Sequence, residues 1–382
     1  MSLKPLFSRA LAAAPGRLHF AAHSHHLWPD ASRDAQLQAW DDAAALADNK
    51  WDKILGEVMP QAQRNVASEL GLPSPDTVVF ASNTHDHLIK LLSAMDRPQV
   101  RVLASDAEFH SFRRQAQRWA ESGRIVLDLM PQDPFDSFAE RFLERARQGG
   151  HDLIFVSQVF FNTGRIFDGV EALADLGRPE GPWVVVDGYH GFRAIPADLT
   201  AVADRVFYLA GGYKYAMAGE GAAFMHAPPG FGPRPEITGW YAEIAGLEGA
   251  AQAVQYATTA QRFAGATFDA SGLYRFNAAF QAMEQADQTT ASISSHVRGL
   301  QEQLLDQIGG GLARAELLNP LGEAPHARFL AFRDPRAGDW KRALAERGAM
   351  VDVRADVLRI GLAPYHDAED VARFCDLCRS AL

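Results

Sequence analysis

Short apolar runs alternate with longer polar-patterned segments between about residue 76 and residue 212. The runs are TVVFAS, VRVLAS, RIVLDLM, DLIFVSQVFF, PWVVVDG and RVFYLAGG. Their β-branched and aromatic content is typical of strands, and the segments between them are long enough for helices. Nearly continuous apolar strands indicate a sheet that is buried on both faces. The pattern therefore predicts an α/β fold with a mostly parallel, doubly wound sheet.

The pattern changes after about residue 271, where long helical stretches come first and short strands follow. HARFLAFR and VDVRADVLRIGLAP are typical of strands, with one helix around WKRALAERG between them and another at the end of the chain. We expect a large α/β domain over residues 16–270. Residues 271–382, together with residues 1–15, are expected to form a smaller α+β domain.

Composition narrows the classes of partner. The chain has 382 residues and a formal net charge of -10, which argues against nucleic acid because binding to phosphates requires clustered Lys and Arg. No apolar run approaches the about 20 residues of a membrane span. Cys375 and Cys378 fall on the apolar face of an amphipathic helix, which is typical of core residues. We therefore expect a cytoplasmic protein that binds a small molecule, not a membrane.

The apolar runs end in polar or glycine-rich residues. SNTHDH, DAEFHSF, NTGR, DGYHG and GGYKY follow five of them. Ligands of doubly wound sheets bind at the carboxyl ends of the strands. These segments are therefore the candidates for a binding site.

Two of these segments carry an acid and a lysine on consecutive strand ends. Asp187 follows a buried strand, where a carboxylate requires a cationic or hydrogen-bonding partner, although it is also compatible with an ordinary strand cap. Lys214 lies among glycines and tyrosines, where an amine loses its proton readily, although a surface lysine is compatible with the same pattern. Together they suit pyridoxal phosphate, since its ring nitrogen needs an acid and its aldehyde needs an amine.

A phosphate site is compatible with SNTHDHLIKLL, a polar turn that opens a helix. Free backbone N–H groups and Thr84 can hold an anion there, although many helices begin in this way.

The order of seven segments resembles a known family. SNTHDHLIKLL, AEFHSF, FVSQVFFNTGRIFD, VVVDGYHG, GGYKY, RFAGATFDASGL and VLRIGLAPYHDAEDV are similar to the class V aminotransferase family of fold-type I enzymes, and above all to its kynureninase-like members. The likeness runs from about residue 18 to the end. It implies pyridoxal 5'-phosphate as cofactor, an α-amino acid as substrate, and a homodimer with the active site at the subunit interface.

The resemblance also implies roles for individual residues. Lys214 matches the Schiff-base lysine, Asp187 the partner of the pyridine nitrogen, and His190 a catalytic residue that contacts the cofactor. Cofactor contacts are further implied for the phosphate turn, the stacking position, the residue before the lysine and two residues that reach across the dimer: Asn83, Thr84, His85, Phe109 or His110, Tyr213, Trp240 and Thr267. Substrate contacts are implied for Arg359, which matches the clamp for the α-carboxylate, and for His23 and Asn162.

The chain departs from kynureninases at two places. Kynureninases have an acidic residue just after the stacking aromatic, where this chain has Ser111 and Phe112. His23, His25 and His26 stand where the family has small or amide residues, which indicates a different substrate. Kynureninase-like hydrolysis of the bond between the β and γ carbons is the leading hypothesis, and transamination is the alternative.

Other classes fit the sequence less well. A cysteine desulfurase needs a cysteine before the carboxylate-binding arginine, and none is there. The adjacent histidines lack the acidic or cysteine companions of a metal site, so no metal is expected. A Rossmann enzyme would have GxGxxG after its first strand. A non-catalytic protein that binds pyridoxal phosphate is a remote alternative, because Lys214 and Arg359 are both present.

Overall fold

The central sheet of the computed structural model joins the predicted strands in a single layer. The structure describes residues 2–244, 253–322 and 325–382, and within them the sheet has the order β2-β8-β7-β6-β5-β3-β4. The bounds are β2 Val78–Ala81, β3 Val100–Ser105, β4 Ile125–Met130, β5 Leu153–Ser157, β6 Trp183–Asp187, β7 Val206–Gly211 and β8 Ala223–His226. β8 runs antiparallel between β2 and β7, and the other strands are parallel. The mostly parallel sheet is thus confirmed.

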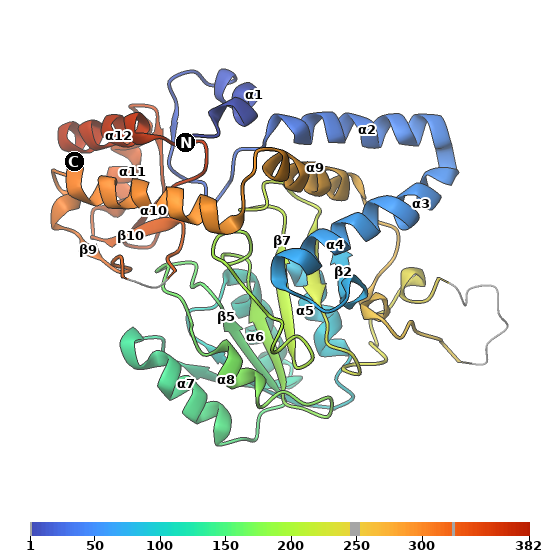
Figure 1. Cartoon of the computed structure of the whole chain (residues 1–382). Helices are drawn as coiled ribbons and strands as arrows, with labels where there is room; N and C mark the ends of the chain where they lie inside the picture. Colours follow the sequence, from blue (N-terminus) through green and yellow to red (C-terminus); the bar gives the residue numbers. More distant parts are fainter. Residues whose placement is uncertain (1, 245–252, 323–324) are drawn as a thin grey trace.

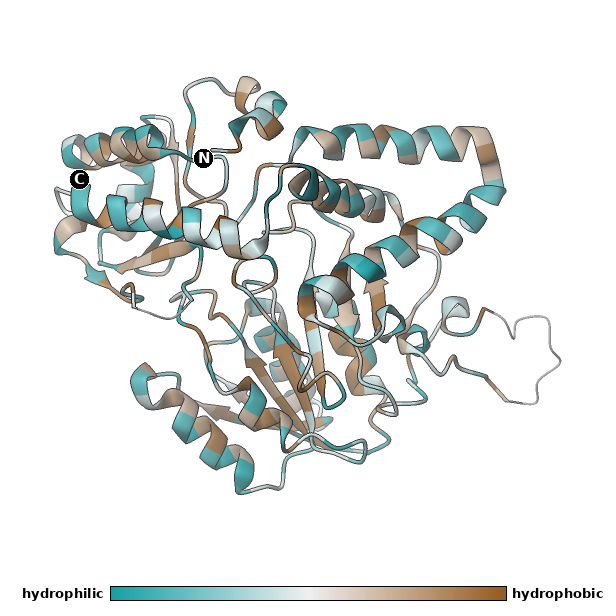
Figure 2. Cartoon of the chain, viewed as in Figure 1, coloured by the Kyte–Doolittle hydropathy of each residue, from teal (hydrophilic) through white to brown (hydrophobic). Residues whose placement is uncertain are grey.

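Side chains that alternate along each strand build two apolar layers. Val184 and Val186 of β6 pack on one face, and Trp183 and Val185 pack on the other. Helices cover both faces: α4 Met59–Leu70, α7 Phe138–Arg147 and α8 Val170–Ala174 on the first, α5 Thr84–Ser93 and α6 His110–Glu121 on the second. Figure 2 shows the apolar strands between helices that are hydrophilic on their outer sides. This is a doubly wound α/β arrangement.

A second core lies in the carboxyl-terminal part of the chain. An antiparallel sheet has the order β12-β13-β10-β9, with bounds β9 Glu316–Leu317, β10 Phe329–Arg333, β12 Asp352–Arg354 and β13 Val357–Gly361. Three helices pack against it: α10 Thr290–Gln307, α11 Ala337–Ala345 and α12 Ala368–Ala381. Figure 1 shows this unit beside the large sheet.

One long helix belongs to both cores. In α9 Ser271–Gln285, Phe276 packs with the central sheet and Met283 packs with the carboxyl-terminal core. α9 also lies against α2 Asp30–Leu46, which is followed by the short α3 Lys50–Lys53. The domain boundary at residue 270 stays a prediction.

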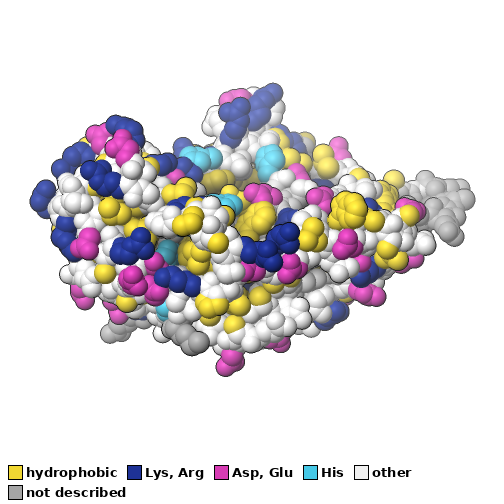
Figure 3. Space-filling model, turned by 90° about the horizontal axis from the view of Figure 1, so that it is seen from above, with side chains coloured by type: hydrophobic (Ala, Val, Ile, Leu, Met, Phe, Trp, Pro, Cys, Tyr) yellow, Lys and Arg dark blue, Asp and Glu magenta, His cyan; other side chains and the backbone are white. Residues whose placement is uncertain are grey.

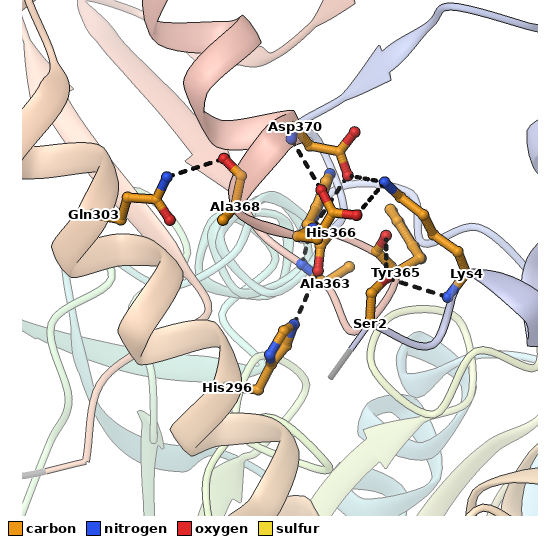
Figure 4. Close-up of polar contacts among 10 residues, drawn as sticks. Ser2, Lys4, His296, Gln303, Ala363, Tyr365, His366, Ala368 and Asp370 are labelled. Atoms are coloured by element: carbon orange, nitrogen blue, oxygen red, sulfur yellow. Dashed lines mark hydrogen bonds and ion pairs between the residues drawn. The ribbon is translucent and has the colours of Figure 1, made fainter.

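The amino-terminal segment joins the carboxyl-terminal core. After α1 Ser8–Ala12, β1 Leu18–His19 pairs in parallel with β11 Ala349–Met350. Figure 4 shows the first residues tied to the start of α12: Lys4 Nζ lies 2.8 Å from Asp370 Oδ2, and Ser2 Oγ donates to the Tyr365 carbonyl at 3.2 Å. Segments from opposite ends of the chain therefore build one unit.

The two cysteines lie in this core, as predicted. Cys375 and Cys378 are both free and fully buried on the inner face of α12. Burial raises the pKa of Cys375 to about 11 and that of Cys378 to about 12, so both thiols stay protonated and unreactive at neutral pH.

The surface carries mixed charge. In Figure 3, basic and acidic side chains are interspersed over the face seen from above. Within the described ranges, no helix is both long and apolar enough to cross a membrane.

Candidate active site

A cavity of about 1380 Å³ opens at the carboxyl ends of the parallel strands. Strand ends of the central sheet line one side of it, and the face of the β12-β13 pair lines the other. The predicted site residues on its wall are His23, Asn83, Thr84, His85, Phe109, His110, Asp187, His190, Tyr213, Lys214 and Arg359. Residues far apart in the sequence thus meet at one place.

Lys214 lies just beyond β7 and faces two aromatic rings and a histidine. Its Nζ is 2.5 Å from His190 Nε2 and 4.9 Å from the centroid of the Tyr189 ring. Burial lowers the pKa of Lys214 to about 7, although Asp187 opposes that change. A large share of the amine is therefore neutral near pH 7, which is the form that attacks an aldehyde.

Asp187 ends β6 with its carboxylate toward the same cavity. The Tyr189 backbone N–H donates to Asp187 Oδ1 at 2.9 Å, because the chain turns sharply after the strand. Burial raises the pKa of Asp187, and Lys214 opposes this change. A carboxylate with one neutral donor is incompletely compensated, so a protonated pyridine nitrogen fits here.

Two histidines at the cavity are held neutral. Burial and the neighbouring Lys214 lower the pKa of His190 well below its usual value, and burial with Arg359 does the same for His23. Neither ring nitrogen of His23 has a hydrogen-bond partner among the described residues, and His190 Nδ1 also has none. His23 packs closely on β13 because Gly361 has no side chain there. Both imidazoles are thus available to a ligand or a water molecule.

The phosphate turn has the expected local structure. The Asn83 side chain accepts from the Asp86 backbone N–H at 3.0 Å and caps α5, and Thr84 and His85 form the first turn. The remaining N–H groups of this turn lie at the positive end of a ten-residue helix. Thr84, His85 and Tyr213 line the cavity beside it, which suits a phosphate.

Both candidates for the stacking position are on the wall. Phe109 precedes α6 and its ring centroid is 5.6 Å from Lys214 Nζ, whereas His110 is the first residue of α6. Both rings contact Phe161, with centroid distances of 5.3 and 5.1 Å. The structure thus places both residues at the cavity, and the Phe109 ring lies within cation–π range of the lysine.

Arg359 is buried on β13 and already has partners. Its guanidinium donates to the Phe161 carbonyl and to the Asp352 carboxylate, while its Nε is buried without a partner among the described residues. Burial lowers the pKa of Arg359, and Asp352 opposes this change. The unpaired Nε leaves a donor for one further acceptor.

The sequence prediction missed three charged residues of the site. Glu108 is fully buried behind the cavity-lining residues and accepts from Ser105 Oγ at 2.6 Å and from Ser157 Oγ at 2.5 Å, where the charge of Asp187 also acts on it. Burial raises the pKa of Glu108 to about 7. Its place in AEFHSF directly before the stacking position was the available signal.

The other two missed residues are Asp352 and Arg354. They alternate in VDVRADVLR, so that the strand period of two puts them on one face. Arg354 lines the cavity together with Arg359, and Asp352 bonds to both of them. Alternation along this segment was a signal that could have found them.

Three predicted site residues do not line this cavity. Asn162 follows β5 and its Oδ1 is buried without a partner among the described residues. Trp240 is 41% exposed, and its Nε1 donates at 3.2 Å to Oγ1 of Thr267, which lines a separate pocket of about 420 Å³. The roles of all three stay predictions. Among the residues that the structure describes, no group of His, Cys, Asp and Glu has an arrangement that could hold a metal ion.

Solved structures share the fold over almost its whole length. The cystine C-S lyase C-DES, in complex with cysteine persulfide, has a TM-score of 0.80 at 18% identity, covering 97% of this chain and 98% of that one. A cysteine desulfurase from Thermococcus onnurineus NA1 has a TM-score of 0.80 at 19% identity, covering 100% of this chain and 98% of that one. In another C-DES structure, glycine is covalently linked to pyridoxal phosphate. The fold is that of fold-type I pyridoxal-phosphate enzymes.

The family model for class V aminotransferases matches residues 47–374. The chain therefore belongs to the class V aminotransferase family, as the sequence predicted. No curated protein matches it by sequence. Membership of this family confirms pyridoxal 5'-phosphate as the cofactor, and it makes the chain an enzyme of amino-acid chemistry.

The site residues fit that cofactor at three of its polar groups. The cavity offers an amine at Lys214, an incompletely compensated carboxylate at Asp187 and a helix start at Thr84. These match the needs of an aldehyde, a pyridine nitrogen and a phosphate.

Proposed function

We propose that this protein cleaves the side chain of an α-amino acid by kynureninase-like hydrolysis of the bond between the β and γ carbons. The observation that carries the proposal is the low-pKa amine of Lys214, 2.5 Å from His190 and on the same cavity wall as Asp187. Such an amine can bind an aldehyde and later move a proton. Both tasks are needed for amino-acid chemistry of this kind.

When bound, pyridoxal phosphate supplies an electron sink for the α carbon of the amino acid. Lys214 is the residue for the aldehyde and then for the α-proton. Asp187 would pair with the ring nitrogen and keep it protonated. Contacts to the remaining parts of the cofactor are proposed for Asn83, Thr84, His85, Phe109 or His110, His190 and Tyr213. The Phe109 ring, whose centroid lies 5.6 Å from Lys214 Nζ, is the proposed stacking partner of the two.

Arg359 is proposed to bind the α-carboxylate of the substrate. Its unpaired Nε is buried at the cavity, and a planar guanidinium suits a carboxylate. His23 is proposed to lie beside the substrate, because its free ring nitrogens and low pKa give it the character of a neutral acceptor. Asn162 is proposed as a further substrate contact, because its buried Oδ1 has no partner among the described residues.

Hydrolysis also requires a positioned water molecule and room for the side chain. The neutral imidazoles of His23 and His190 are suitable partners for water. Phe109, Phe112 and Phe161 line the cavity and give an apolar surface for a bulky side chain. The apolar surface for a bulky side chain, with neutral imidazoles beside it that can orient a water molecule, supports hydrolytic cleavage of the side chain over transamination, in which water releases only the keto acid.

A persulfide mechanism is disfavoured by the positions of the cysteines. Desulfurases with this fold are among the similar structures. Here the two cysteines of the chain, Cys375 and Cys378, are buried in the core of α12, away from the cavity-lining residues. Neither thiol can accept sulfur at the cavity without unfolding of the helix.

The active unit is proposed to be a homodimer. Trp240 and Thr267 bond to each other outside the Lys214 cavity of their own subunit, and Trp240 is exposed. These features suit contact with the cofactor of a second subunit. Light scattering during gel filtration checks this: a dimer is expected, and a monomer with full activity would contradict it.

The reaction is tested on the purified holoenzyme with L-kynurenine. Anthranilate fluorescence and an equal amount of alanine are expected. Production of a keto acid instead would replace the proposal with transamination, and production of pyruvate and ammonia from L-cystine would replace it with C–S cleavage. Lys214→Ala is the control that must remove every one of these products.

A further inference from the structure

The cavity wall formed by the small sheet carries a compact charged cluster. Asp352 on β12 is directly opposite Arg359 on β13, and Arg354 lies two residues further along β12 on the same face. Asp352 and Arg359 are 6% and 2% exposed. The cluster is thus part of the strand pairing and has a fixed position beside the cavity.

One carboxylate bridges both arginines. Asp352 Oδ2 accepts from Arg359, and Asp352 Oδ1 accepts from Nη1 of Arg354 at 3.2 Å. The three side chains carry two positive charges and one negative charge. The cluster therefore presents one net positive charge to the cavity.

The remaining hydrogen-bonding capacity also suits one anion. Nη1 of Arg359 donates a hydrogen bond to the Phe161 carbonyl, and Nε of Arg359 has no partner among the described residues. His23 Nε2 lies 3.8 Å from Asp352 Oδ2 and is held neutral, so it adds no charge. One incoming carboxylate would accept a hydrogen bond from Nε of Arg359, and its negative charge would balance the net positive charge of the cluster.

We propose that Asp352 determines specificity by neutralising Arg354, so that the cavity accepts amino acids with one carboxylate and discriminates against those with a second carboxylate in the side chain. The inference rests on the proposed binding of the α-carboxylate by Arg359. A side-chain carboxylate that approaches Arg354 finds Nη1 of this guanidinium shared by Asp352 and the Val353 carbonyl, and Nε buried without a described partner. It also meets the negative charge of Asp352. Specificity of this kind arises from repulsion as much as from attraction.

Asp352→Asn tests the proposal because it removes the charge and keeps the shape. The holoenzyme is titrated calorimetrically with butyrate and with glutarate, which are unreactive and differ by one carboxylate. We expect the affinity for glutarate to rise about tenfold more than the affinity for butyrate. An unchanged ratio of the two affinities overturns the proposal.

Two further variants keep the test decisive. Asp334→Asn removes a carboxylate that is paired with Arg336 on the same domain, and it is expected to leave both affinities unchanged. Arg354→Gln leaves Asp352 paired with Arg359 alone, so the preference for butyrate over glutarate is expected to increase. In the double variant Asp352→Asn with Arg354→Gln, the increase in affinity for glutarate is expected to disappear. If the increase remains, the proposed role of Arg354 is wrong.

Arg359→Lys separates the inference from the function on which it rests. If this variant binds butyrate as the wild type does, the proposed carboxylate site at Arg359 is wrong. If Arg359→Lys no longer binds butyrate, and Asp352→Asn nevertheless leaves the ratio of the glutarate and butyrate affinities unchanged, only the inference about Asp352 is wrong. Calorimetry needs no turnover, so both outcomes are readable without a known substrate.

Discussion

The two walls of the cavity differ in how far their ionisable side chains are paired. On the wall formed by the central sheet, Lys214, Asp187 and His190 have few partners, and burial shifts the pKa of each toward its neutral form. On the wall formed by the small sheet, Arg359 and Asp352 are paired directly across two strands. The polar groups of the first wall therefore lack partners until a ligand binds, whereas most polar groups of the second wall have partners within the protein.

This difference suggests that the first wall carries the reaction and the second wall binds the substrate. A neutral amine and an undercompensated carboxylate are reactive states that a bound cofactor can use. A paired guanidinium keeps its charge and its orientation, which suits the binding of a carboxylate. Substitutions on the first wall should alter the cofactor and its spectrum, while substitutions on the second should alter affinity.

The largest effect is expected from Lys214→Ala. Because the Lys214 amine lies at the cavity, 2.5 Å from His190, the variant should lose the visible band that borohydride bleaches, and turnover should fall more than about a thousandfold. Absorbance and steady-state rates measure both. Lys341→Ala, at an exposed lysine of α11, is the matched control. A band that persists in Lys214→Ala would contradict the assignment.

A smaller loss is expected from Asp187→Asn. The amide keeps the acceptor for the Tyr189 N–H but cannot hold a proton on the ring nitrogen, so turnover should fall about a hundredfold while the cofactor stays bound. Steady-state rates and the cofactor spectrum check this. Asp204→Asn, on the surface, should match the wild type. Equal turnover in Asp187→Asn would remove the distinction between the walls.

The pH dependence of cofactor loading gives a more graded effect. Burial lowers the pKa of Lys214 from 10.5 to about 7, and only the deprotonated amine reacts with an aldehyde. Loading of the apoprotein should therefore speed up about tenfold per pH unit below pH 7 and level off above it. Stopped-flow absorbance measures the rate, with butylamine as the reference amine. A rate that keeps rising to pH 10 would show an ordinary lysine.

No catalytic effect is expected from Cys375→Ala or Cys378→Ala. Both thiols pack inside the core of α12, so each change should lower the free energy of unfolding by about 1 kcal/mol. Urea unfolding and turnover are measured on the same samples. A loss of turnover without a loss of stability would restore the persulfide mechanism.

Most of the first wall was predictable from the sequence. Asp187 and Lys214 follow long apolar runs, and the ends of parallel strands meet at one edge of a sheet. β8 was not predicted, because AFMH has only four residues and Phe224 is the one strongly β-forming residue among them. The polar turn in SNTHDHLIKLL already suggested a phosphate site, whereas the role of Arg359 came from the family resemblance.

The second wall was less predictable because it depends on strand register. Arg359 was expected as a clamp, but its pairing with Asp352 follows from which residues of β12 and β13 face each other. Glu108 was missed for a related reason. Its burial depends on Ser157, which lies about fifty residues away and reaches it through the order of β3 and β5 in the sheet.

The pairing of the amino-terminal segment with β13 has a consequence for biosynthesis. The Gly361 N–H donates to the Phe20 carbonyl at 2.8 Å, and Ala21 forms an isolated parallel β-bridge with Gly361. A chain emerging from the ribosome exposes the segment around His23 long before its partner strand has been translated. The substrate wall is consequently assembled last, after the residues that hold the cofactor have been synthesised.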